Sequence, residues 1–360
     1  MPNPTSATAI QTFSMDTGGP AEGRAARVGE RQAVPAGAQG SGSAHYEKPV
    51  KSQVLSIIEP YMNEPIIKEV APLKLSGDDE SGYAPSGCVL RLGDRTDTIL
   101  ACADPSVQRT TDTGLTFAGR FGFCSEKEGH PIAMSLIGGT TLTKGEFGLR
   151  LESAEYRAKI VKLDRATETV TVSPAPASPD EMVGEYVFIT NPVRRSAYTV
   201  LEAKAIPDGA ELRLDLDSRI GTGKVTGVAD YEVKTETPFE LQGFRYYLGA
   251  RIVSSDRKAE YRITEVATKK AALIDKTCHP EAKADKLLQE FPKDTWFEVY
   301  DYGLGDEVVW PHRVSLVRTG EKTYGATGTG KFAVALPPDC LWERLPLQAQ
   351  GQPSRLAYLK

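Results

Sequence analysis

The residues of this 360-residue chain best suited to chemistry lie in one stretch, WFEVYDYGLGDEVVWPHRVSLVRT, from Trp296 to Thr319. Within it, Tyr302, His312 and Arg313 supply a phenol, an imidazole and a guanidinium. Such a group could perform β-elimination, because a base removes a proton while a cation stabilises the charge of the carbanion. A lone strand histidine is more often structural, so a lyase using these three catalytic residues is an alternative interpretation.

The same stretch contains aromatic rings that could bind a sugar. Aromatic rings stack on the apolar faces of sugars, and neighbouring carboxylates accept hydrogen bonds from hydroxyls. The candidate substrate-binding residues here are Trp296, Tyr300, Asp301 and Trp310. The competing interpretation is that the rings fill a core, where each contributes about 1.5–3 kcal/mol when buried. Trp310 fits that interpretation better.

Two arginines upstream complete the candidate substrate-binding set. In GDRTDTILACADPSVQR, Arg95 stands near Asp97, and Arg109 follows Asp104. These pairs are expected to form ion pairs at strand ends, and exposed pairs of this kind contribute little to stability. The same arginines could instead bind an acidic sugar.

Other chemistries are disfavoured. GATGTGK, from Gly325 to Lys331, matches a phosphate-binding loop up to its lysine. The next residue is Phe332, where that loop needs Ser or Thr, and a strand-like FAVALPPD follows instead of a helix. The four histidines are scattered, and no HExxH, GxSxG or paired CxxC pattern occurs. We therefore expect neither a metal nor a cofactor.

Bulk properties exclude further classes. The net charge is -5 and no basic patch stands out, so we do not expect a nucleic-acid partner. No apolar run approaches the length of a membrane span. The first residues lack the basic and apolar regions of a secretory signal peptide, and the compartment stays open. Five scattered cysteines indicate buried free thiols, with one pair among Cys88, Cys102 and Cys124 as the alternative.

Most of the chain has the two-residue alternation of half-buried strands. From Cys88 onward, short apolar runs are separated by turn sequences such as KEGH, IPDG and GTG. The stretch from Trp296 to Thr319 is interpreted as two strands joined by a glycine turn at 302–306. One helix is predicted at 280–291, with Leu287, Leu288 and Phe291 on its apolar face.

A weak internal repeat supports this interpretation. Segments beginning near Tyr156, Tyr198 and Tyr261 each open on a tyrosine, run as an alternating strand, turn and return. VGEYVFI and LGARIV precede the second and third copies in the same way. The uneven spacing excludes a strict solenoid or propeller.

The predicted fold is all-β: antiparallel β-sandwich layers with repeated hairpins, one short helix and a disordered N-terminal tail. The predicted domains are a tail or linker at 1–48, a first β-sandwich at 49–180, a second β-rich domain at 181–345 that includes the helix, and a C-terminal tail at 346–360. Residues 1–45 are rich in Gly, Ala, Ser and Pro, which favours disorder.

Part of the sequence resembles the β-rich C-terminal region of heparinase II/III-like polysaccharide-degrading proteins. The resemblance covers about Cys88 to Arg318. It rests on an Arg-x-Asp-Thr-Ile strand at 95–99, a Gly-Arg-x-Gly strand at 119–122, a Gly-Gly-Thr turn at 138–140, and the hairpins VGEYVFI…AYTVLEA and FEVYDYGLGDEV.

That resemblance implies elimination chemistry on acidic polysaccharides, with catalytic groups largely on an α/α toroid that precedes the β region. This chain contains no helical segment of that size, so no catalytic residue is carried over. The implied function is a non-catalytic, carbohydrate-associated β module whose partner is an acidic polysaccharide or a catalytic toroid, in an extracellular or periplasmic location. Alternatives are an active polysaccharide lyase and a structural or surface-assembly protein.

Overall fold

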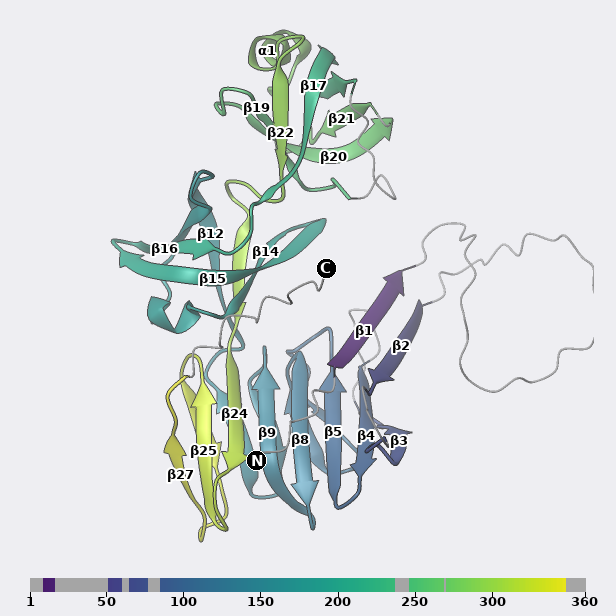
Figure 1. Ribbon diagram of the computed structural model, residues 1–360, viewed down its shortest axis with the longest axis vertical. Coiled ribbons are helices and arrows are strands. Elements are labelled where there is room, and N and C mark those ends of the chain that lie inside the picture. Colours follow the sequence, from purple (N-terminus) through teal and green to yellow (C-terminus); the bar gives the residue numbers. More distant parts are fainter. Residues whose placement is uncertain are drawn as a thin grey trace, which may run out of the picture.

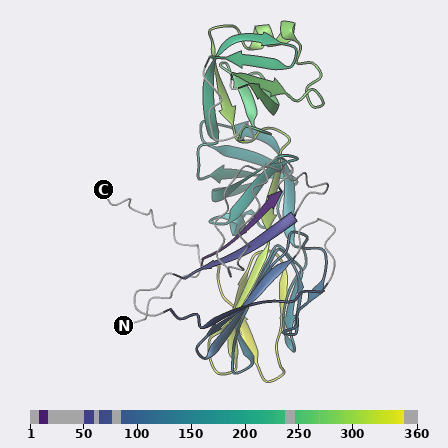
Figure 2. The same ribbon diagram turned by 90° about the vertical axis from the view of Figure 1, so that its right-hand side faces the viewer.

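The computed structural model of this chain describes residues 9–16, 51–59, 65–76, 85–236, 246–268 and 270–347. Three β units are stacked along the long axis: a sandwich at one end, a closed barrel in the middle and a second closed barrel at the other end (Figure 1). A separate antiparallel pair, β1 (Ala9–Asp16) and β2 (Lys51–Ile58), lies beside the sandwich (Figure 2). The predicted all-β class is confirmed.

The sandwich consists of two sheets. The bounds of the larger sheet, in spatial order, are β27 (Leu341–Arg344), β25 (Thr323–Gly328), β24 (Arg313–Arg318), β9 (His130–Ile137), β8 (Phe121–Lys127), β5 (Arg95–Ala101), β4 (Ser86–Leu92) and β3 (Glu69–Pro72). The smaller sheet contains β26 (Phe332–Ala335), β11 (Phe147–Leu151), β10 (Thr141–Lys144), β7 (Leu115–Ala118) and β6 (Arg109–Thr110). Neighbouring strands are antiparallel, except for the parallel pair of β25 and β27.

Alternation of side chains determines which face of each sheet is covered. On β8 and β9, Cys124 and Met134 point into the core, where they pack with Phe117 and Leu142 of the smaller sheet. All four side chains are fully buried, and each buried side chain of this size contributes about 1.5–3 kcal/mol. The side chains that alternate with Cys124 along β8 and with Met134 along β9 therefore point to the outer face of the larger sheet.

The first barrel closes in the order β12 (Glu155–Asp164), β13 (Thr169–Ser173), β16 (Gly209–Leu214), β15 (Arg194–Ile206), β14 (Tyr186–Asn191) and β23 (Glu307–Pro311), with the 3-10 turn η1 (Pro179–Met182) before β14. The second closes in the order β17 (Arg219–Ala229), β18 (Glu232–Thr235), β21 (Ala271–Ile274), β20 (Glu260–Thr268), β19 (Arg251–Ser254) and β22 (Trp296–Tyr300), with helix α1 (Ala284–Glu290) before β22.

The two barrels are structural repeats of each other. In each, the strands follow the same spatial order relative to their order along the chain. Gly184 and Gly249 both have positive φ, and each donates its N–H over 2.8 Å to a carbonyl of the following long strand, at Val200 and Ile263 respectively. Tyr198 and Tyr261 occupy matching positions on these strands, both buried. The second and third copies of the sequence repeat are therefore the corresponding parts of two barrels.

The three units are nested insertions rather than a simple series. The chain leaves the sandwich at β12 and returns through β23, and these two strands pair at Glu155 and Pro311. The second barrel is inserted in the first in the same way, because β17 and β22 pair at Arg219 and Tyr300. The predicted boundary between domains 49–180 and 181–345 falls in η1, between strands β13 and β14 of the first barrel. The sheets therefore place the boundaries between units elsewhere, where the chain enters and leaves each barrel.

Several local predictions need correction. The strands at 296–300 and 307–311 do not form a hairpin: β22 pairs with β17 and β19, whereas β23 pairs with β12 and β14. The helix begins at Ala284 rather than at residue 280, and Leu288 is exposed although Leu287 is buried. The glycine-rich segment 325–331, interpreted as a loop between strands, belongs to strand β25 as far as Gly328, and strand β26 follows it as predicted.

Two further predictions concern cysteines and tails. All five cysteines are free thiols, and Cys88, Cys102 and Cys124 are buried as predicted, whereas Cys278 is exposed and Cys340 is half-buried. Within the predicted tail, the structure describes only Ala9–Asp16, which forms β1. The rest of 1–48, and the C-terminal segment beyond residue 347, lie outside the described residues.

Candidate functional site

The predicted catalytic group is not brought together. Tyr302 lies in the core of the first barrel near the second barrel, whereas His312 follows β23 at the end that joins the sandwich. Residues 303–311 separate them along the chain, and β23, the last five of these residues, is about 17 Å long. Arg313 forms a bidentate ion pair with Glu185, at 2.8 Å from Nε to Oε2 and 2.5 Å between the second pair of atoms.

Each of these three side chains also forms contacts that occupy its reactive group or disfavour its ionisation. Burial is the first cause that raises the pKa of Tyr302, followed by the nearby Glu168 carboxylate, so its phenolate is disfavoured. The Tyr302 hydroxyl donates to Glu168 Oε2 over 3.2 Å. His312 Nδ1 lies 3.1 Å from both the hydroxyl and the carbonyl oxygen of Ser153. The Glu185 carboxylate raises the pKa of Arg313 and occupies its guanidinium fork.

The predicted sugar-stacking residues are dispersed as well. Trp296 is 57% exposed on the second barrel, whereas Tyr300 and Trp310 are 3% and 2% exposed. Trp310 belongs to the core of the first barrel, and the Tyr300 ring lies under the Arg165 guanidinium at 3.9 Å. Trp310 packs edge-to-face against His312 with 5.0 Å between ring centroids. These two residues line a cleft of about 820 Å³ between the sandwich and the first barrel, called here the junction cleft.

Asp301 belongs to a buried polar network where the two barrels meet. It forms an ion pair with Arg194 and accepts a 2.5 Å hydrogen bond from the Tyr198 hydroxyl. The neighbouring Asp306 is likewise buried and forms an ion pair with Arg251 of the second barrel. These carboxylates are compensated by cations, as burial requires, and their role is to join the barrels.

The two predicted arginines have different environments. Arg109 is 1% exposed, and its guanidinium donates to the Val107 carbonyl over 2.7 Å, so it is part of the sandwich interior. Arg95 is exposed at the start of β5. Its guanidinium contacts the Asp97 carboxylate at 3.1 Å, and Asp97 also accepts a 2.6 Å hydrogen bond from Ser125.

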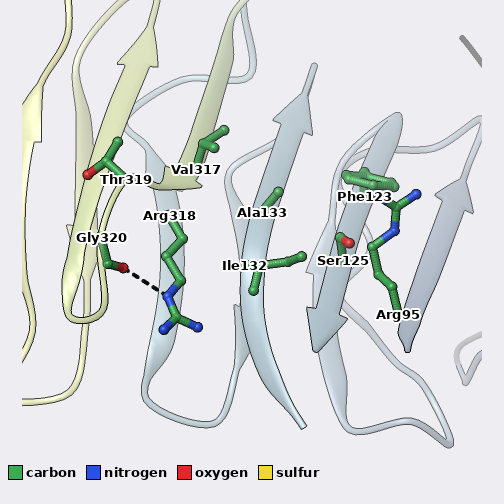
Figure 3. Close-up of a pocket in the computed structure, with 9 residues that line it drawn as sticks. All are labelled: Arg95, Phe123, Ser125, Ile132, Ala133, Val317, Arg318, Thr319 and Gly320. Atoms are coloured by element: carbon green, nitrogen blue, oxygen red, sulfur yellow. Dashed lines mark hydrogen bonds between the residues drawn. The ribbon is translucent and has the colours of Figure 1, made fainter. Parts of the chain in front are cut away.

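Arg95 lies in an open groove of about 590 Å³ on the outer face of the larger sheet, called here the sheet groove. Figure 3 shows Arg95 and Arg318 on opposite sides, with Ile132 and Ala133 between them and Phe123 beside Arg95. The groove crosses β24, β9, β8 and β5. It therefore combines an apolar floor with two guanidinium groups.

The register of the strands explains why these residues meet. Val317, Ala133, Ser125 and Asp97 stand opposite one another on adjacent strands and form one row across the sheet. Neighbouring strands are about 4.8 Å apart, so the row spans about 14 Å. Phe123 lies two residues from Ser125 on the same face of β8.

Part of this face is covered by the chain itself. Ile57 and Ile67 pack on the buried Cys88 and Leu90 of β4, and Phe123 borders the same cluster. No residue that the structure describes covers the adjoining sheet groove. Among the described residues, Arg318 has no carboxylate partner, and its Nε donates to the Gly320 carbonyl over 2.9 Å.

Sequence reasoning did not identify Phe123 or Arg318. A signal exists for Phe123, because in FGFCSEK the outward positions carry Phe121, Phe123 and Ser125 while Cys124 points inward. Arg318 gives no comparable signal, since its place opposite Arg95 depends on four strands from distant parts of the sequence.

Within the described part of the chain, no group of three or more His, Cys, Asp or Glu side chains is arranged to hold a metal ion. The same residues include no helix that is long and apolar enough to cross a membrane. Comparisons with protein-family models, with curated proteins and with solved structures gave no match.

Proposed function

We propose that this chain is a non-catalytic β module that binds an acidic polysaccharide in the sheet groove, as part of a heparinase II/III-like polysaccharide-degrading system. The observation that carries the proposal is the open groove in which Arg95 and Arg318 flank Phe123 and Ala133. Aromatic and aliphatic side chains offer an apolar surface to sugar rings, and guanidinium groups form bidentate hydrogen bonds with carboxylate or sulfate groups.

The shape of the groove favours binding of a polymer over cleavage. It is open along the sheet, so that a chain can extend beyond both ends. The described residues that line it include arginines and hydroxyls but no histidine, tyrosine or carboxylate, and the neighbouring Asp97 carboxylate is paired with Arg95 and Ser125. The separation of Tyr302, His312 and Arg313 gives the lyase alternative no comparable geometric support.

Binding to polygalacturonate and heparin, measured by isothermal titration calorimetry, tests the proposal, with a neutral β-glucan as the reference ligand. We expect Phe123→Ala and Arg318→Ala to raise the dissociation constant of the acidic polymer by about tenfold each. Arg150→Ala is the matched control, because Arg150 is exposed on β11 of the other sheet.

Circular dichroism melts establish that each variant is folded, which matters most for Phe123 because its ring borders a buried cluster. Equal affinity of wild type and both variants for the acidic polymers would refute the binding site. Release of unsaturated oligosaccharides by the wild-type chain, detected by ultraviolet absorbance, would refute the non-catalytic assignment.

A further inference from the structure

A third concavity, of about 440 Å³, lies on the outer wall of the first barrel and is called here the cationic pocket. Its charged lining residues are strongly biased in sign: Arg120, Arg157, Lys159, Arg195 and Arg262 against Asp306 and Glu307. The whole chain has a net charge of -5, so this excess of positive charge is local. Clefts lined by one sign of charge concentrate counter-ions.

Most of these cations already have partners. Arg157 donates to Glu307 Oε2 over 2.5 Å and to Glu155 Oε1 over 2.7 Å. Arg262 contacts the buried Asp306 carboxylate at 3.4 Å. Both acidic residues of the lining are therefore occupied by arginines.

Two cations remain without an acidic partner. Lys159 and Arg195 form no ion pair with any other described residue. The Arg195 guanidinium lies 4.0 Å from the centre of the Phe188 ring, which fixes its position without neutralising its charge. Arg195 is exposed. Partial desolvation of its guanidinium and the neighbouring Arg120 lower the pKa of Arg195, whereas the Glu155 carboxylate raises it.

Strand register places these two side chains at the ends of one row. Lys159 is opposite Glu307, Glu307 is opposite Thr190, and Thr190 is opposite Arg195. Three inter-strand steps make about 14 Å between the outer Cα atoms. Because both side chains are long, an oxyanion a few ångströms wide can contact both of them above the centre of the row.

The second barrel provides an internal comparison. Lys224 pairs in register with Trp296 of β22, just as Lys159 pairs with Glu307 of β23 in the matching strands. The Lys224 ammonium, however, forms a 3.1 Å ion pair with Asp294. The matching lysine of the first barrel, Lys159, has no such partner among the described residues, so the two barrels differ in whether this charge is compensated.

We propose that the cationic pocket binds the oxyanion group of a small ligand, a sulfate, phosphate or carboxylate, between Lys159 and Arg195. This site is separate from the sheet groove, and it does not rest on the proposed polysaccharide-binding function. The ammonium and guanidinium groups supply charge-assisted hydrogen bonds, and the guanidinium also matches the paired oxygens of an oxyanion. The bound anion relieves the repulsion among the surrounding arginines.

The experiment measures binding of sodium sulfate, sodium phosphate and sodium glucuronate to the full chain, by thermal shift and by calorimetry. Sodium chloride at the same ionic strength corrects for general screening. We expect at least one of these anions to raise the melting temperature above the chloride reference, and its dissociation constant to rise at least about tenfold in Lys159→Ala/Arg195→Ala. Preference for sulfate and phosphate, or for glucuronate, identifies which oxyanion the pocket takes.

The matched control is Lys162→Ala/Arg150→Ala, which removes one exposed lysine of β12 and one exposed arginine of the sandwich, both outside the pocket. This variant is expected to bind like the wild type. The proposal is overturned if no anion exceeds the chloride reference, or if both double variants lose binding equally. Circular dichroism of the Lys159→Ala/Arg195→Ala variant checks that it is folded, and Lys159→Gln provides a milder second test with the same expected direction.

Discussion

At the scale of single residues, three tyrosines donate hydrogen bonds to carboxylates and therefore stay protonated. Tyr198 and Tyr261 each donate a 2.5 Å hydrogen bond to a carboxylate, at Asp301 and Glu290 respectively. Tyr300 donates to Glu298 Oε2 over 2.7 Å. Each hydrogen bond requires a protonated phenol, and burial opposes its ionisation. Tyr300, one of the residues that suggested chemistry in sequence, therefore makes a structural hydrogen bond within β22.

This protonation predicts how stability changes in alkali. Burial, followed by the Glu298 carboxylate, raises the pKa of Tyr300 to about 12, whereas an unfolded tyrosine titrates near pH 10. Between these values only the unfolded state loses the proton, so the free energy of unfolding falls as pH rises, by about 2 kcal/mol for this group. Below about pH 10 the contribution is fully present.

Urea unfolding of wild type and Tyr300→Phe at about pH 9 and about pH 11.5 checks this expectation. The variant lacks an ionisable phenol, so the stability advantage of the wild type is expected to shrink at the higher pH. Tyr186→Phe serves as the control, because Tyr186 is 54% exposed. A difference between wild type and Tyr300→Phe that does not depend on pH would contradict the assignment.

At the scale of elements, the segment between β22 and β23 is a connection between barrels. Asp306 accepts hydrogen bonds from the Gly303 N–H over 2.9 Å and forms ion pairs with Arg251 and Arg262 of the second barrel. Glu260 accepts from the Leu304 N–H over 3.2 Å. The glycines there allow a close approach to these side chains, rather than the tight hairpin turn that the sequence suggested.

Gly303→Ala tests this connection. A Cβ at Gly303 would lie 1.9 Å from Glu260 Oε1 and 2.6 Å from Arg251 Cγ, so both side chains must move. We expect the free energy of unfolding to fall by about 1–3 kcal/mol, because buried polar groups lose partners. Gly227→Ala, in β17, is the control: no atom lies within 4 Å of its Cβ position, and no loss is expected. Equal melting temperatures of the two variants would argue against a tightly packed connection.

At the scale of the whole molecule, nesting makes each barrel a removable unit. The second barrel begins and ends at paired residues, Arg219 and Tyr300, whose Cα atoms are about 5 Å apart. Its core is separate from that of the first barrel. The two units meet through ion pairs, in which the second barrel supplies the partners of Asp306.

Excision of residues 219–300, with a short Gly-Ser linker from Ser218 to Asp301, is expected to leave a folded sandwich and first barrel when combined with Asp306→Asn. Without that substitution the excised chain is expected to be less stable by about 3–5 kcal/mol, because a buried carboxylate is left without its cations. Circular dichroism and urea unfolding measure both, and sandwich-dependent binding of polygalacturonate is expected to persist. Failure of the Asp306→Asn form to fold cooperatively would show that the barrels are one folding unit.

Some features follow from the sequence alone. The two-residue alternation and the turn residues determine that the chain is all-β, because side chains of a strand alternate between its faces whichever strand lies beside it. Of the three tyrosine-led copies, those at Tyr198 and Tyr261 correspond to matching strands of two barrels, whereas Tyr156 lies on β12 of the same barrel as Tyr198, so the prediction of three equivalent copies is wrong. The sparse, scattered cysteines correctly indicated free thiols.

Which strands pair with each other was decided by the tertiary structure. The pattern from Trp296 to Thr319 gave two strands, yet their hydrogen-bonding partners are β17 and β19 for one and β12 and β14 for the other. Periodicity reports which face of a strand is buried and carries no information about distant partners. Arg95 could be proposed from sequence because it lies close to Asp97 in the chain. Arg318 and the pair of Lys159 and Arg195 could be identified only from the tertiary structure, which places strands far apart in the chain side by side.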